Sequence, residues 1–148
     1  MTPTELFFNY AAAFEQSYND DDWSRVYPFF HDDAVYEIIG GQYACVLTGP
    51  KAIFVGMKKS LDGFDRRFDT RKLAADSDFV EDGSTLRVSW HVTYNKEGLP
   101  PFVLPGKTVM RVRDSKIEYI GDELPREAEL DMAEWIAKTG YEISPAYA

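Results

Sequence analysis

The chain has 148 residues, the length of one ordinary domain, and 45% of them are hydrophobic, enough to bury a core without disulfides or metal ions. The formal net charge of −9 disfavours nucleic acid as a partner, because an acidic surface repels phosphate groups. A single cysteine, Cys45, and the lack of any apolar run near the roughly 20 residues of a membrane helix indicate one cytoplasmic domain over residues 1–148 that does not enter a membrane.

Helix signals come first along the chain. Apolar residues recur at three- and four-residue steps from Leu6 to Tyr18, after a Thr-Pro start, which is typical of a capped amphipathic helix. Further on, two short runs of β-branched and aromatic residues flank Gly40-Gly41 and predict a hairpin. The expected elements of this half are helices over residues 2–18, 23–30 and 49–63, a turn at 31–33, and strands over residues 34–39 and 43–47.

The second half of the chain is mainly sheet. Val88, Trp90, Val92 and Tyr94 alternate with polar residues, which is the pattern of a strand with one buried face. Turn signals separate successive runs and indicate an antiparallel meander, whereas three prolines keep residues 99–106 either irregular or at an edge of the sheet. The expected elements are strands over residues 68–75, 86–94, 107–113 and 116–124, followed by a helix over residues 125–140.

Three stretches and the order of elements resemble the NTF2-like superfamily, in particular its SnoaL-like and ketosteroid isomerase branch. The stretches are residues 18–37, where YNDDDW leads to FHDDAVYE, residues 49–53, GPKAI, and residues 112–117, VRDSKI. The resemblance implies an α+β cone, the cystatin-like fold, in which three N-terminal helices wrap a curved, mixed but mostly antiparallel sheet. The core spans residues 1–124, and residues 125–148 add a C-terminal helix and tail.

The same resemblance implies a pocket on the concave face of the sheet and a homodimer through the convex face. Strand alternation then directs the apolar residues of strand 86–94 and Asp122 inward, and His91 outward. The expected partner is a small apolar or aromatic ligand. The candidate substrate-binding residues are Tyr18, Trp23, Tyr27, Tyr36, Phe54, Met57, Trp90, Val92, Tyr94, Thr108, Met110 and Ile120.

The catalytic residues of ketosteroid isomerases are absent. Those enzymes use an Asp base, a Tyr and a protonated Asp, and the matching positions hold Ile38, Phe14 and Thr108. Asp122 is the best catalytic candidate, because it matches the last-strand acid of related cyclases and epoxide hydrolases and because burial raises a carboxyl pKa. Arg71 is the second candidate, since an inward-facing third strand would pair it with Asp122.

Two functions remain open. The first is a cofactor-independent acid/base enzyme, of isomerase, cyclase or hydrolase type, that acts on a small apolar or ring-bearing substrate. The second is a non-catalytic ligand-binding or dimerisation domain of the same fold. Neither His31, in a turn, nor His91 belongs to a metal-binding spacing, so no metal and no cofactor are expected.

Overall fold

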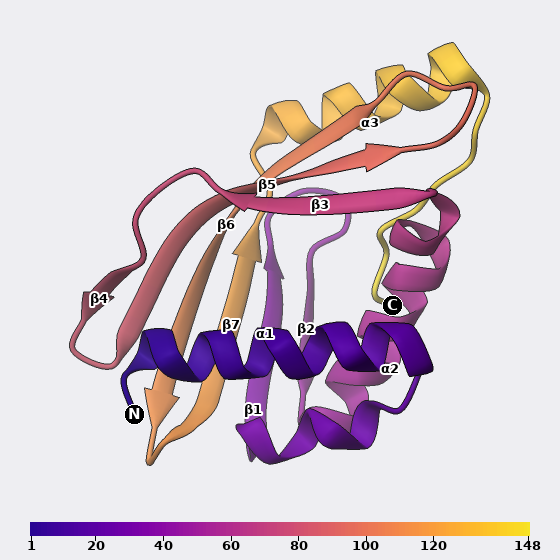
Figure 1. The fold of residues 1–148 in the computed structure, drawn as a ribbon. Helices are drawn as coiled ribbons and strands as arrows, with labels where there is room; N and C mark the ends of the chain where they lie inside the picture. Colours follow the sequence, from indigo (N-terminus) through magenta and orange to yellow (C-terminus); the bar gives the residue numbers. More distant parts are fainter.

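The computed structural model of the protein describes all of residues 1–148. Figure 1 shows the elements in chain order. They are α1 (Pro3–Asp20), the 3₁₀ turns η1 (Trp23–Arg25) and η2 (Tyr27–Phe29), β1 (Phe30–Ile39), β2 (Cys45–Thr48), α2 (Pro50–Gly63), the 3₁₀ turn η3 (Asp65–Arg67), β3 (Thr70–Ala75), β4 (Val80–Asp82), β5 (Thr85–Asn95), β6 (Phe102–Arg113), β7 (Lys116–Glu123) and α3 (Arg126–Thr139).

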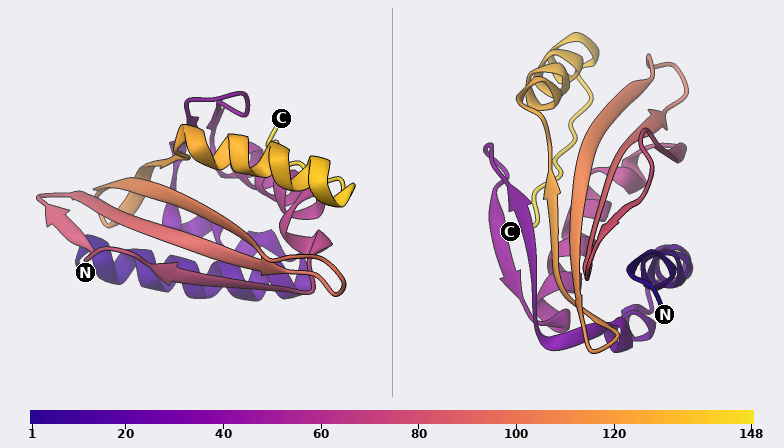
Figure 2. Two further views of the ribbon diagram at one scale, coloured as in Figure 1. Left: turned by 90° about the horizontal axis from the view of Figure 1, so that it is seen from above. Right: turned by 90° about the vertical axis from the view of Figure 1, so that its left-hand side faces the viewer.

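The strands form one sheet in the order β2-β1-β7-β6-β5-β3, and β4 pairs with β5. Every pair is antiparallel except β1 with β7, so the sheet is mixed. The sheet is curved, α1 crosses its strands, and α3 lies at the opposite end (Figures 1 and 2). The expected α+β fold with a curved, mostly antiparallel sheet and an added C-terminal helix is confirmed. No helix is long and apolar enough to span a bilayer.

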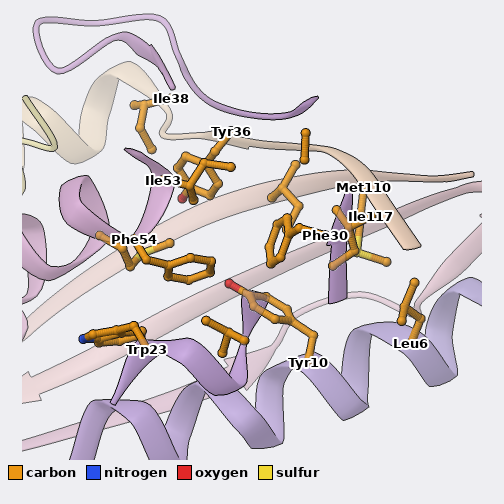
Figure 3. Packing of buried hydrophobic residues seen from close by; sticks show 14 of the residues in the cluster. Leu6, Tyr10, Trp23, Phe30, Tyr36, Ile38, Ile53, Phe54, Met110 and Ile117 are labelled. Atoms are coloured by element: carbon orange, nitrogen blue, oxygen red, sulfur yellow. The ribbon is translucent and has the colours of Figure 1, made fainter. Parts of the chain in front are cut away.

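Two buried clusters lie on the inner face of the sheet. In the first (Figure 3), Phe54 of α2 stacks on Trp23 at a ring-centroid distance of 5.6 Å and contacts Tyr10 of α1 at 6.4 Å. In the second, Trp135 of α3 packs on Phe102 of β6 at 5.8 Å. The apolar stripes of α1, α2 and α3 therefore each have a buried partner, and the C-terminal helix contributes to the hydrophobic core.

Two elements near the N-terminus differ from the prediction. The expected second helix is a pair of 3₁₀ turns, because Pro28 supplies no backbone N–H to continue a helix. Residues 31–33, expected as a turn, belong to β1, which begins at Phe30. A register irregularity between Phe30 and Val35 accommodates these polar residues beside β7.

Residues 99–101 are irregular, whereas residues 102–106 are a strand segment with a neighbour on one side only, the second of the two expected alternatives. β6 begins at Phe102, and Pro105 pairs with His91 of β5. Pairing of β6 with β7 begins only at Lys107. Pro105 thus has no strand on its other side, so its missing N–H leaves no ladder hydrogen bond unmade.

Candidate functional site

A cavity of about 280 Å³ lies between the inner face of the sheet and helices α1 and α2. Its wall is mostly aromatic and aliphatic. Three of its lining residues are exposed to solvent, namely Leu73, at 59% relative exposure, and Ala75 of β3 together with Glu15 of α1. Because β3 is an edge strand, we place the mouth of the cavity between β3 and α1.

The carboxyl of Asp122 faces the cavity from β7. It lies opposite Ile38 of β1 and Thr108 of β6 in the strand register. Thr108 Oγ1 donates to Asp122 Oδ1 at 2.6 Å, and the Tyr36 hydroxyl donates to Oδ2. Burial nevertheless raises the pKa of Asp122, because two neutral donors only partly replace the water that a carboxylate needs.

A chain of hydrogen bonds orients Asp122 from the β6 side. The indole Nε1 of Trp90 donates to Thr108 Oγ1 at 2.8 Å, so the Thr108 hydroxyl directs its own hydrogen to Asp122. Gly106 makes this possible. A Cβ at Gly106 would lie 2.5 Å from the indole atoms Cζ2 and Cη2, so only glycine lets the ring of Trp90 lie flat across β6.

Two tyrosines orient Asp122 from the other side. The rings of Tyr36 and Tyr147 are stacked at 5.3 Å and 21°, and their hydroxyls are 3.2 Å apart. Since Tyr36 gives its hydrogen to Asp122, Tyr147 is the donor between the two hydroxyls. Burial raises the pKa of Tyr36 and Tyr147, and of Tyr10, which also lines the cavity. These phenols therefore remain protonated donors at neutral pH.

A second polar group lies towards the mouth of the cavity. Arg71 Nη2 donates to Glu15 Oε1 at 2.9 Å, and the guanidinium lies 4.4 Å over the ring of Tyr18. Arg71 Nε is buried without a hydrogen-bond partner, 3.8 Å from Asp65 Oδ2. Asp65 accepts from the Tyr94 hydroxyl at 3.0 Å, and burial raises its pKa despite the nearby arginine. This group offers both a donor and an acceptor to a ligand.

The expected pair between Arg71 and Asp122 does not form. Arg71 lies opposite Tyr94, whereas Asp122 lies opposite Thr108, which itself lies opposite Val88. Val88 and Tyr94 are six residue steps apart on β5, or about 20 Å along the strand. Arg71 does face the cavity, as expected, but it pairs with Glu15 instead.

Most of the residues predicted from the sequence line the cavity. They are Tyr36, Met57, Trp90, Val92, Tyr94, Thr108, Ile120, Arg71 and Asp122. Five other predicted residues are not part of its lining. Trp23, Phe54 and Met110 are buried in the first cluster, Tyr27 lies at the surface with 36% exposure, and Tyr18 packs on Arg71.

Sequence reasoning missed several lining residues. Tyr10 and Phe14 belong to the predicted apolar stripe of α1, and that periodicity could have identified them. Pro145 and Tyr147 follow the last helix in a segment without regular structure, where no pattern indicates a direction. The other missed residues are Phe7, Ala11, Glu15, Tyr43, Ser60, Leu61, Phe64, Asp65, Leu73, Ala75, Phe79 and Leu104. Ile38, Val88 and Leu124 also line the cavity, and strand alternation does direct these three inward. No group of three or more His, Cys, Asp and Glu side chains is arranged to hold a metal ion.

Comparison of the sequence with family profiles finds the SnoaL-like domain, matched over residues 11–120. No curated protein sequence matches the chain.

Several solved structures are similar in fold. TerC, co-crystallised with polyporic acid, is 17% identical with a TM-score of 0.62, and the match covers 89% of this chain and 98% of that one. A protein with a ketosteroid isomerase-like fold from Catenulispora acidiphila, in complex with trimethylamine, is 17% identical with a TM-score of 0.61, covering 98% and 97%. An NTF2-like protein from Burkholderia thailandensis is 13% identical with a TM-score of 0.64, covering 90% and 98%.

Proposed function

The chain belongs to the SnoaL-like family, and from this premise we propose that it binds a small, largely apolar, ring-bearing molecule in its cavity and exchanges a proton with it through Asp122. The reaction needs no cofactor. One observation carries the proposal, namely a half-buried carboxyl that faces an aromatic cavity and is held there by two hydroxyl donors.

The environment of Asp122 suits proton transfer near neutral pH. A carboxyl whose pKa is raised by burial can hold a proton where an exposed one has lost it. Protonated Asp122 can donate to a ligand oxygen, and ionised Asp122 can accept a proton from the ligand. The hydrogen bonds from Tyr36 and Thr108 fix its direction in either state.

The shape of the cavity supports a ligand with a flat apolar body and a polar group at more than one position. Aromatic rings of Phe14, Trp90 and Tyr147 provide surfaces on which a ring can pack. Arg71 and Asp65 provide a second polar contact near the mouth. Two similar folds were crystallised with polyporic acid and with trimethylamine, which also favours a small organic ligand.

A ligand screen tests both binding and catalysis. Thermal shift and native mass spectrometry with polycyclic, steroid-like and terpenoid compounds identify ligands, and turnover of these is then measured for the wild type and Asp122→Asn. We expect the variant to bind within a few-fold of the wild type and to lose about 10²- to 10⁴-fold in turnover. Glu37→Gln is the matched control, because Glu37 accepts from the Tyr119 hydroxyl outside the cavity. Absence of binding by every compound contradicts the proposal.

A second function, ligand binding without catalysis, is favoured by a different observation. Both carboxyl oxygens of Asp122 are already engaged by protein donors, and Phe14, Ile38 and Thr108 stand where isomerases carry catalytic groups. Under this alternative a bound compound is recovered unchanged from the wild type. Asp122→Asn would then alter affinity alone.

We also propose that the chain forms a homodimer through the outer face of the sheet. Both buried clusters use the inner face, and the outer face presents a mixed surface around Val109 and Tyr119, whose ring lies 4.0 Å from the guanidinium of Arg111. Light scattering is expected to give twice the 16.9 kDa of one chain. Val109→Asp is expected to yield the monomer, whereas Leu130→Asp on the exposed side of α3 leaves the mass unchanged.

A further inference from the structure

The C-terminal tail, residues 141–148, returns from α3 to the candidate site. In Figure 1 this yellow segment leaves the last helix and ends beside α2. Two of its residues, Pro145 and Tyr147, line the cavity. The tail lies outside residues 11–120, which match the family profile, so its role is not described by the family match.

Helix α2 has a surface that fits the tail. Gly56, Ser60 and Gly63 follow one another at steps of four and three residues and therefore share one face of the helix. A Cβ would lie 2.9 Å from Tyr147 O at Gly56 and 2.7 Å from Ser144 O at Gly63. Glycine disfavours helix formation, and at these two positions it permits close contact with the tail backbone.

Hydrogen bonds fix the tail in this position. Ser60 Oγ donates to Pro145 O at 2.9 Å, and Ser144 N donates to Gly63 O at 2.9 Å. Ile143 is buried in the second cluster with 6% exposure. The tail is thus anchored at three consecutive residues, 143–145, directly before Tyr147.

The tail places one functional group in the cavity, the phenol of Tyr147. Its ring stacks on Tyr36, and its hydroxyl donates to the Tyr36 hydroxyl, which donates to Asp122. The tail therefore supplies the outer member of the hydrogen-bond chain that ends at Asp122.

We propose that Tyr147 is a positioning residue of the candidate site, which directs the Tyr36 hydroxyl at Asp122, and that the tail keeps this end of the cavity free of water. The inference rests on the proposed role of Asp122 as the proton-transfer group. Under this proposal the tail contributes Tyr147 to the hydrogen-bond network around Asp122.

Two variants are expected to shift the pKa of Asp122 in opposite directions. Tyr147→Phe removes the donor to Tyr36, so Tyr36 becomes a weaker donor to the carboxylate and the pKa of Asp122 rises; we expect about a two- to fivefold loss of acidity. A chain that ends at Pro145 lacks Tyr147 altogether and admits water to Asp122. Because burial is the main cause of the raised pKa, we expect its acidity to increase about tenfold or more.

The experiment measures the acidity of Asp122 in the ligand-free protein. Asp carboxyl carbons are labelled with ¹³C and titrated by NMR, and Asp122→Asn assigns the signal. Tyr141→Phe is the matched control, because Tyr141 belongs to the same tail but donates to Arg67 O outside the cavity; it is expected to leave Asp122 unchanged.

A rise of the pKa in Tyr147→Phe together with a fall in the shortened chain supports the proposal. Equal acidity of Asp122 in all of these proteins, or shifts in the same direction, overturns it and reduces the tail to a structural element. If the shortened chain does not fold, Tyr147→Phe alone decides, since an unchanged pKa there overturns the positioning role. The titration needs no ligand. A ligand screen without binders would therefore contradict the proposed function, but the role of Tyr147 would still be decided by the titration.

Discussion

At the scale of single residues, the central feature is a half-buried carboxyl that the fold holds between two hydroxyl donors. Asp122 could be directed inward from sequence alone, because Ile120 and Leu124 fix the alternation of its strand. Its partners Tyr36 and Thr108 lie on β1 and β6. The choice of partners depends on the order of strands in the sheet, which the sequence does not encode locally.

Asp122→Asn is expected to change how stability depends on pH. In the unfolded chain the carboxyl of Asp122 ionises around its ordinary pKa of 3.8. In the folded protein the same carboxyl still holds its proton at that pH, because its pKa is raised. The wild type therefore loses stability as the pH rises from about 4 to the folded pKa, at about 1.4 kcal/mol for each tenfold difference in acidity. The variant lacks this loss. Urea unfolding at several pH values from 4 to 8 measures it.

Glu37→Gln serves as the control for this pH series, because it removes a carboxyl outside the cavity. Asp65, whose pKa is also raised, is present in all three proteins and cancels from the differences. Unfolding free energies of the wild type and Asp122→Asn that run parallel from pH 4 to 8 would show that the folded carboxyl is as acidic as the unfolded one.

Gly106→Ala is expected to disrupt the Trp90 side of the site. The new Cβ would lie 2.5 Å from the indole, so the ring must move and lose its 2.8 Å hydrogen bond to Thr108. Overpacking of this kind costs about 1–3 kcal/mol. Urea unfolding measures the loss, and the indole N–H signal of Trp90 in NMR reports the broken bond.

Lys107→Ala is the matched control for this substitution. Lys107 is the next residue of β6, and its side chain is exposed on the outer face. An indole signal that stays in place in Gly106→Ala would mean that the ring of Trp90 does not depend on the glycine.

At the scale of elements, the sequence predicted the middle of helices and strands better than their first and last residues. The alternation in β5 and the stripe of α1 could be recognised because each repeats over several residues. The start of β6 could not be recognised in this way. Pro105 is tolerated there because β7 pairs with β6 only from Lys107 onward. Likewise, residues 31–33 join β1 because β7 lies beside them. Such contacts between distant segments have no local signal.

Gly56→Ala tests whether α2 is shaped for the tail. In an unencumbered helix this change stabilises by about 1 kcal/mol. Here the Cβ would lie 2.6 Å from Leu47 Cδ1 and 2.9 Å from Tyr147 O, so we expect a net loss of about 1–2 kcal/mol. Urea unfolding measures the loss, and hydrogen exchange of the Ser144 amide is expected to accelerate as the tail separates from Gly63.

Val55→Ala provides the comparison within the same helix, because Val55 is 66% exposed and does not line the cavity. It is expected to change stability by no more than about 0.5 kcal/mol. A more stable Gly56→Ala protein with an unchanged Ser144 amide would contradict the close fit.

At the scale of the whole molecule, the order of elements identified the fold, and the curved sheet follows from it. The resemblance could not describe how α3 and the tail dock. It treated residues 125–148 as an addition to a core over residues 1–124, whereas Trp135 and Ile143 are buried with Phe102 of the sheet. The apolar face of α3 could be predicted from the sequence, but the surface that receives it is assembled from β5, β6 and the two phenylalanines that flank η3, Phe64 and Phe68.

Trp135→Ala is expected to destabilise the whole protein, because α3 closes the end of the sheet that α1 and α2 leave open. Trp135 is 7% exposed, packs on Phe68 and Phe102 at 5.6 and 5.8 Å, and donates to Pro100 O at 3.1 Å. Large-to-small changes of this type cost about 3–5 kcal/mol, a large part of the net stability of a domain. Leu130→Ala, at a 60% exposed position of the same helix, is expected to cost less than about 0.5 kcal/mol. Urea unfolding followed by circular dichroism compares the two variants, and equal losses would mean that α3 is not held by its buried face.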